Sequence, residues 1–125
     1  YFNVQLQSLT WETIQGYCFD SDRDVVWLEG SAQMALALQV AGQEASYRHL
    51  LRSLEQAAIP SPQHPGLKAL PYAANQGSNF GRELLWPHAD QKPAISATVW
   101  YLFARNRFNP FDLGEAYKPM PGPNS

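Results

Sequence analysis

The sequence is poor in charge and has almost no cysteine, and both shortages narrow what the protein can be. Asp, Glu, Lys and Arg make up only 16% of its 125 residues, and the net charge is −2. Because the chain has no basic run, we expect no nucleic-acid partner. Cys18 is the single cysteine, which excludes an internal disulfide and a cysteine-built zinc site. One thiol fits reducing and oxidising compartments alike, so the localisation stays open.

Long apolar runs and the common catalytic motifs are missing as well. The longest apolar segment is short for a bilayer and is interrupted by Glu29 and Gln33, so we expect no membrane span. The chain has no glycine-rich phosphate loop, and no serine stands in a nucleophile-elbow motif. These absences predict a protein that works without a nucleotide or other cofactor.

Metal-binding patterns are equally weak. The three histidines, His49, His64 and His88, are far apart and share no ligand spacing. The acidic stretch at 20–24 (DSDRD) lacks the glycine and the final glutamate of an EF-hand loop. We therefore predict no metal site.

Two segments are apolar nearly all round. Residues 27–41 (WLEGSAQMALALQVA) and 93–105 (PAISATVWYLFAR) have helical character, and Pro93 suits a first helical turn. A helix of this kind needs protein on every side, which a chain of this length hardly supplies. We therefore expect the helices to pack against the remainder of a larger chain, or to self-associate through their apolar faces.

A third segment, at 43–58, is amphipathic. Tyr47, Leu50 and Leu54 fall on one stripe of this predicted helix. Gly42 ends the helix before it. Because the link is so short, the two helices should form an antiparallel hairpin.

The rest of the chain divides around these helices. Residues 1–24 form an N-terminal extended or irregular segment, in which 10–14 is expected to make one or two helical turns after Thr10 as N-cap. Residues 25–111 form the helical domain, including a long loop at 59–90 whose many large apolar side chains predict an ordered, packed structure. Residues 112–125 form a loose, proline-rich tail.

In chain order, the three predicted helices are buried, half-exposed and buried. This order is typical of αα-hairpins arranged in a ring. The segments WLEGSAQMALAL, LLRSLEQA, GLKALPYAANQG and KPAISATVWYLFARNRFNPF together resemble the closing hairpins of α/α-toroid proteins, a class that includes six-hairpin glycosidases and terpenoid-cyclase-like toroids. The resemblance implies an all-α fold of antiparallel αα-hairpins. Because these helices are too few to close a ring, it also implies an incomplete toroid, the C-terminal part of a longer protein.

In such a hairpin arrangement the loop and the N-terminal ends of the two apolar helices share one face. Glu29 is the candidate catalytic residue, as a general acid or base; the structural alternative is that it stabilises the start of its own helix. Its possible partner carboxylates are Asp22, Asp24 and Asp90. The candidate substrate-binding residues on this face are Trp27, Gln33, Tyr72, Asn75, Arg82, Trp86 and Lys92.

Three functions compete at this stage. The first is glycoside hydrolysis or saccharide binding at the loop face, with aromatic rings stacking on sugars while carboxylates and amides pair with hydroxyls. The second is a non-catalytic helical module that docks to a partner. The third is a terpenoid-cyclase-like toroid, for which the DSDRD stretch is only a weak acidic motif.

Overall fold

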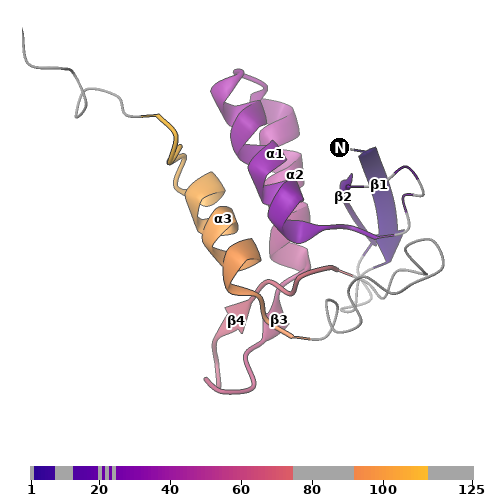
Figure 1. Ribbon diagram of the computed structural model, residues 1–125, viewed down its shortest axis with the longest axis vertical. Helices are drawn as coiled ribbons and strands as arrows, with labels where there is room; N and C mark the ends of the chain where they lie inside the picture. Colours follow the sequence, from indigo (N-terminus) through magenta and orange to yellow (C-terminus); the bar gives the residue numbers. More distant parts are fainter. Residues whose placement is uncertain are drawn as a thin grey trace, which may run out of the picture.

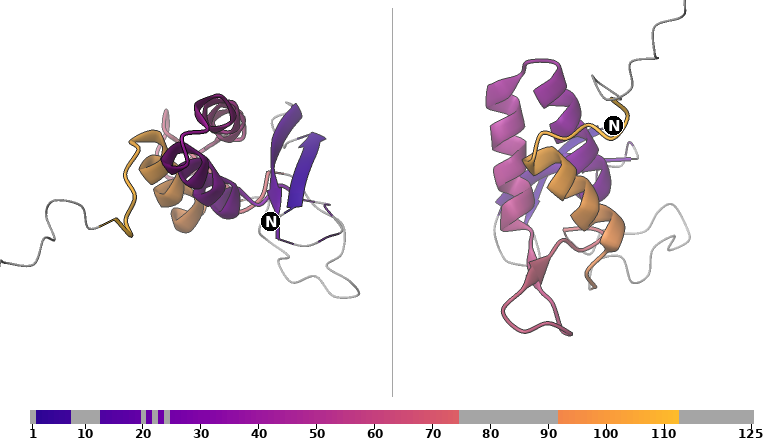
Figure 2. Two further views of the ribbon diagram at one scale, coloured as in Figure 1. Left: turned by 90° about the horizontal axis from the view of Figure 1, so that it is seen from above. Right: turned by 90° about the vertical axis from the view of Figure 1, so that its left-hand side faces the viewer.

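The residues that the structure describes form three helices and two small antiparallel sheets. The computed structural model describes residues 2–7, 13–19, 21, 23, 25–74 and 92–112. The elements, in chain order, are β1 (Phe2–Gln7), β2 (Thr13–Cys18), α1 (Leu28–Val40), α2 (Glu44–Gln56), β3 (Ile59–Pro60), β4 (Lys68–Ala69) and α3 (Ile95–Arg105). The α1–α2 pair forms the middle layer, with β1–β2 on one side and α3 on the other (Figures 1 and 2).

This architecture corrects the expected fold class. The protein is a small mixed α/β domain, not an all-α protein and not part of an α/α toroid, whether glycosidase-like or terpenoid-cyclase-like. The N-terminal hairpin packs on α1 and α2 and forms a β layer that an all-α ring does not have. The resemblance of the helical segments to toroid hairpins therefore does not extend to the fold.

The helical turns expected after Thr10 are also wrong at Ile14, which lies in β2. In this strand Ile14, Gly16 and Cys18 alternate inward. One or two isolated helical turns are unstable in water, whereas pairing with β1 from Phe2–Cys18 to Gln7–Thr13 buries the alternating face. Cross-strand pairing and burial outweigh the local capping signal.

Along the edge of β2 that faces away from β1, serine hydroxyls accept hydrogen bonds from the backbone N–H groups. The backbone N–H of Gln15 donates to Ser53 Oγ (3.2 Å) on α2, and that of Tyr17 donates to Ser31 Oγ (2.9 Å) on α1. Ser31 Oγ in turn donates to the Trp27 carbonyl (2.7 Å). Ser31 and Ser53 are the polar side chains buried within the described residues, so both buried hydroxyls dock the hairpin onto the helices.

The turn between α1 and α2 has the geometry of a Schellman motif. Gly42 has φ +76°, and the Gln43 N–H donates to the Leu38 carbonyl at 2.8 Å. The amphipathic pattern of α2 is confirmed, since Tyr47 and Leu54 are buried.

Residues 70–74 tie together the N-terminal ends of α1 and α3. The N–H of Leu28, the first residue of α1, donates to the Tyr72 carbonyl (3.2 Å). On the α3 side, the Ala94 N–H donates to the Leu70 carbonyl (2.8 Å), and Thr98 Oγ1 accepts from the Leu70 N–H (3.1 Å). Both helices therefore start at the same end of the domain (Figure 1).

A clamp fixes the opposite end of α3 to α2. Arg107 follows α3 with φ +55°, a conformation that favours glycine. Its guanidinium pairs with the Glu44 carboxylate and lies 4.8 Å from the centre of the Tyr47 ring. The Tyr47 hydroxyl donates to the Ala104 carbonyl (2.8 Å). These contacts offset the strained backbone and hold the segment after α3 in place.

The expectation that both apolar helices are buried all round is wrong. On α1, Leu28 is fully buried, but Val40 is 61% exposed. On α3, Ala97 and Ala104 are buried while Ile95 is 84% exposed. With three helices in two layers, α3 contacts protein on one side, and the described residues leave its other side uncovered.

Ser31→Ala tests the hydroxyl that joins α1 to β2. The substitution leaves the Tyr17 N–H without its acceptor in a buried setting, so we expect the free energy of unfolding to fall by about 1–3 kcal/mol. Denaturant unfolding followed by circular dichroism measures this loss. Ser46→Ala, at an exposed position of α2, is the matched control and should change stability little. Equal stability of the two variants would contradict the docking role of Ser31.

The Arg107–Glu44 pair predicts an acid-sensitive clamp. Hydrogen bonds from Arg107 and then Arg48 lower the pKa of Glu44 from 4.5 to about 2. Because the folded-state pKa is depressed, the stabilisation is complete above pH 4.5 and is lost as the pH falls toward 2. A carboxyl NMR titration of Arg107→Gln should show the Glu44 pKa moving back toward 4.5. Arg52→Gln, on the same helix, is the control, and an unchanged Glu44 pKa in Arg107→Gln would refute the clamp.

Candidate functional site

Trp27 lies immediately before α1, and its ring packs over the start of the helix. A Cβ atom added at Gly30 would come within 2.2 Å of Trp27 Cε3, so the glycine makes room for the indole. The Phe19 ring meets the indole edge to face, with 5.7 Å between centroids. These contacts give Trp27 a packing role at the junction of β2 and α1, and its predicted role as a sugar-stacking platform stays a prediction.

Glu29, Gln33 and Tyr72 come together on another side of α1. Glu29 and Gln33 are one turn apart, and Gln33 Nε2 lies 3.5 Å from Glu29 Oε1. Burial raises the pKa of Tyr72, and the negative charge of Glu29 adds to this rise. A carboxylate, an amide and a phenol thus share a half-buried surface near the N-terminal end of the helix.

The remaining predicted residues add little to this cluster. Lys92 is exposed beside Pro93, which forms a β-bridge with Pro71 at the start of α3. Asn75, Arg82 and Trp86 lie outside the described residues. The acidic residues Asp20, Asp22, Asp24 and Asp90 also lie outside them.

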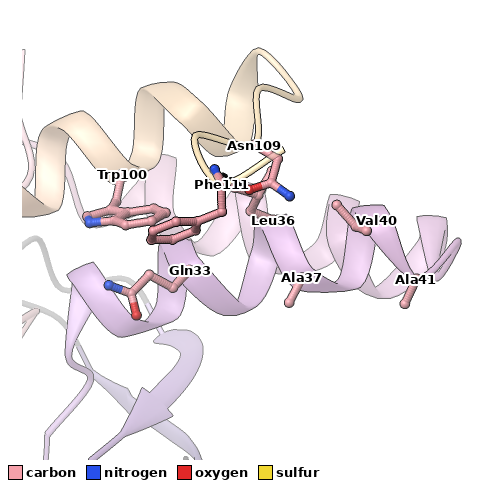
Figure 3. A pocket seen from close by; sticks show the side chains of 8 residues that line it. All are labelled: Gln33, Leu36, Ala37, Val40, Ala41, Trp100, Asn109 and Phe111. Carbon is pink, nitrogen blue, oxygen red and sulfur yellow. Dashed lines mark hydrogen bonds between the residues drawn. The ribbon is translucent and has the colours of Figure 1, made fainter. Parts of the chain in front are cut away.

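A groove of about 480 Å³ runs along α1 from the Glu29–Gln33 end toward the end of α3 (Figure 3). Trp100 and Phe111 form one wall, with ring centroids 5.9 Å apart and planes inclined by 34°. The Trp100 ring is held from behind by Phe103, edge to face at 5.6 Å. The full lining consists of Gln33, Leu36, Ala37, Val40, Ala41, Trp100, Asn109 and Phe111.

Two amides supply the polar groups of the groove. Gln33 stands at one end, facing the Trp100–Phe111 pair, and Asn109 stands beside Phe111 (Figure 3). Asn109 Oδ1 accepts a hydrogen bond from the Phe111 N–H (3.0 Å). An apolar, aromatic-walled groove with a few polar groups is the usual form of a small-molecule site.

Sequence reasoning missed most of this groove. It placed Trp100 inside a helix that was expected to be buried all round, and it gave no binding role to Asn109 or Phe111. The signal was the aromatic spacing of Trp100, Phe103, Phe108 and Phe111 across the end of α3. Of the predicted site residues that the structure describes, Gln33 is the one that lines the groove.

A second cavity, of about 330 Å³, lies between the hairpin and the α1–α2 pair. His49 Nε2 lies 2.8 Å from Gln15 Oε1, and Gln15 Nε2 donates to Asn3 Oδ1 (2.9 Å). This chain of side chains joins α2 to both strands. Because the His49, Gln15 and Asn3 side chains bond to one another, we regard the cavity as a structural junction.

The described residues contain no group of three or more His, Cys, Asp or Glu side chains placed to hold a metal ion. Among the helices of the described ranges, none is long and apolar enough to cross a bilayer.

Comparison with known proteins gives no relative from which a function is transferred. No family model, no curated protein and no solved structure matches this chain.

Proposed function

We propose that this domain binds a short, neutral saccharide in the groove between α1 and the end of α3. The observation that carries the proposal is the Trp100–Phe111 wall facing the Gln33 amide across the groove (Figure 3). An aromatic wall accepts the C–H face of a sugar ring, while amide groups pair with its hydroxyls.

The size and charge of the groove support a neutral ligand. Its volume of about 480 Å³ falls within the range of small-molecule sites. Among the residues that the structure describes, no charged side chain lines the groove. Glu29 reaches it only through Gln33, so the carboxylate orients the amide rather than contacting the ligand.

Binding is proposed here in preference to hydrolysis. Cleavage of a glycosidic bond usually needs two carboxyl groups on either side of that bond. Glu44 and Glu55 are held by arginines at the α2–α3 face, far along the chain from the Glu29 turn. We therefore propose a positioning role for Glu29 in binding, and its expected catalytic role stays a prediction, because Asp22, Asp24 and Asp90 lie outside the described residues.

The second candidate function is a non-catalytic interaction module. The observation that favours it is the exposed apolar side of α3, where Ile95 and Leu102 face away from the other helices. This surface is separate from the groove.

Trp100→Ala tests the stacking wall. In ligand-detected NMR with a panel of short neutral oligosaccharides, we expect at least one to bind and the variant to lose roughly tenfold in affinity, about 1.4 kcal/mol, because the ligand would cover the half-buried Trp100 ring. Gln33→Leu should weaken binding by removing the amide while leaving the Trp100 ring in place. His49→Ala, in the second cavity, is the control and should bind like the unmodified protein.

The same experiment separates the proposal from its rivals. Folding of each variant is checked by circular dichroism, so that lost binding is not mistaken for lost structure. A linear alkyl alcohol serves as an apolar probe. If it binds in the groove and no saccharide does, the groove is a hydrophobic site and the proposed function is wrong.

A further inference from the structure

We propose that two copies of this chain associate through the outward side of α3, with the two helices antiparallel about a two-fold axis near Val99. The surface consists of Ile95, Val99 and Leu102, bordered by Phe108. In isolation these side chains are 84%, 37%, 46% and 55% exposed, in that order. The inference does not depend on saccharide binding, because the groove lies on a different side of α3.

The large side chains of the stripe point outward because α3 packs against α1 and α2 through small residues. Ala97 and Ala104 are fully buried, and the Tyr47 hydroxyl reaches the Ala104 carbonyl at 2.8 Å. Small residues let α3 approach α1 and α2 closely, so the apolar bulk of the helix lies on the opposite side. A solvent-facing helix normally shows the reverse pattern, with its large apolar residues turned inward.

The spacing of the exposed residues matches one heptad of the contact line between two paired helices. Ile95, Val99 and Leu102 stand at positions i, i+4 and i+7, which fall on one narrow stripe. No charged residue stands on this stripe. The nearest charged side chain of the helix, Arg105, turns toward α2, where it pairs with Glu55, and it also donates to the Tyr101 hydroxyl of its own helix.

A second copy is the occupant that this stripe fits best. A two-fold axis brings the same patch of both copies together. With the two helices antiparallel, Val99 meets its counterpart, and Ile95 lies over Leu102 of the other copy. This arrangement also places the N-terminal end of each helix near the C-terminal end of the other, which is favourable for their dipoles.

The exposed area is sufficient for a weak dimer. If a large apolar side chain has roughly 200 Å² of surface, the four exposed fractions amount to about 450 Å² for each copy. If two copies buried all of it, about 900 Å² of apolar surface would leave solvent, which is below the ~1,200 Å² of standard interfaces and in the range of weak, transient contacts. We therefore expect a weak, reversible dimer.

Single cysteines test both the contact and its direction. Cys18 is buried, so the unmodified chain serves as the background. Under mild oxidation, Val99→Cys should form a covalent dimer. Ile95→Cys alone should not, because the antiparallel arrangement places its two copies about 12 Å apart along the helix axis, beyond disulfide reach. A mixture of Ile95→Cys and Leu102→Cys should cross-link.

Sedimentation velocity over a concentration series tests the association itself. The sedimentation coefficient of the unmodified chain should rise with concentration, and Val99→Glu should remove the rise by placing like charges against each other. Gln56→Glu, which adds the same charge at an exposed position of α2, should dimerise like the unmodified chain. A monomer at every concentration, with no cross-link through Val99→Cys, would overturn the proposal. Cross-linking of Ile95→Cys alone would overturn the antiparallel direction.

Discussion

The outer edge of β2 is the constraint on which the helix arrangement depends. Its backbone amides at Gln15 and Tyr17 face away from β1, and a third strand does not pair with them there. A hydroxyl from each of two helices takes that place. Gly16 makes the close approach possible, since a Cβ atom there would come within 2.4 Å of Val26 Cγ1 and 2.8 Å of Ser31 Oγ. The hairpin and the α1–α2 pair therefore have one mutual position in which the buried amides are satisfied.

That position makes α1 the central helix and determines where the groove lies. One side of α1 meets β2, a second meets α2 and a third meets α3. The side that remains carries Gln33, Ala37 and Val40, and the segment after α3 folds back beside it. The clamp of Arg107 on Glu44 fixes the start of that segment, so Phe111 reaches the Trp100 ring. The groove thus results from the packing of the other three sides of α1.

The helices can be predicted from the sequence because the spacing of apolar residues within each segment indicates a helix without reference to the rest of the chain. The inward stripe of α2 was found in this way. The hairpin was not, because its short strands alternate only loosely and become strands through pairing with each other and through hydroxyls at distant Ser31 and Ser53. Likewise, Gln33 was identified as a polar residue among apolar neighbours, whereas Trp100 looked like core. The exposure of Trp100 depends on how many helices pack around α3. A local sequence pattern carries no information on that number.

The two surfaces of α3 allow both proposed activities at once. Successive helical residues are about 100° apart around the axis, so Val99 and Trp100, although adjacent in sequence, point in different directions. Val99 belongs to the outward stripe, while Trp100 faces α1 and the groove. Association through the stripe therefore leaves the grooves of both copies accessible. The dimer then carries two binding sites that are linked to each other. For a ligand with repeated units, such as an oligosaccharide, linked sites bind more tightly than either site alone when their spacing permits joint occupancy.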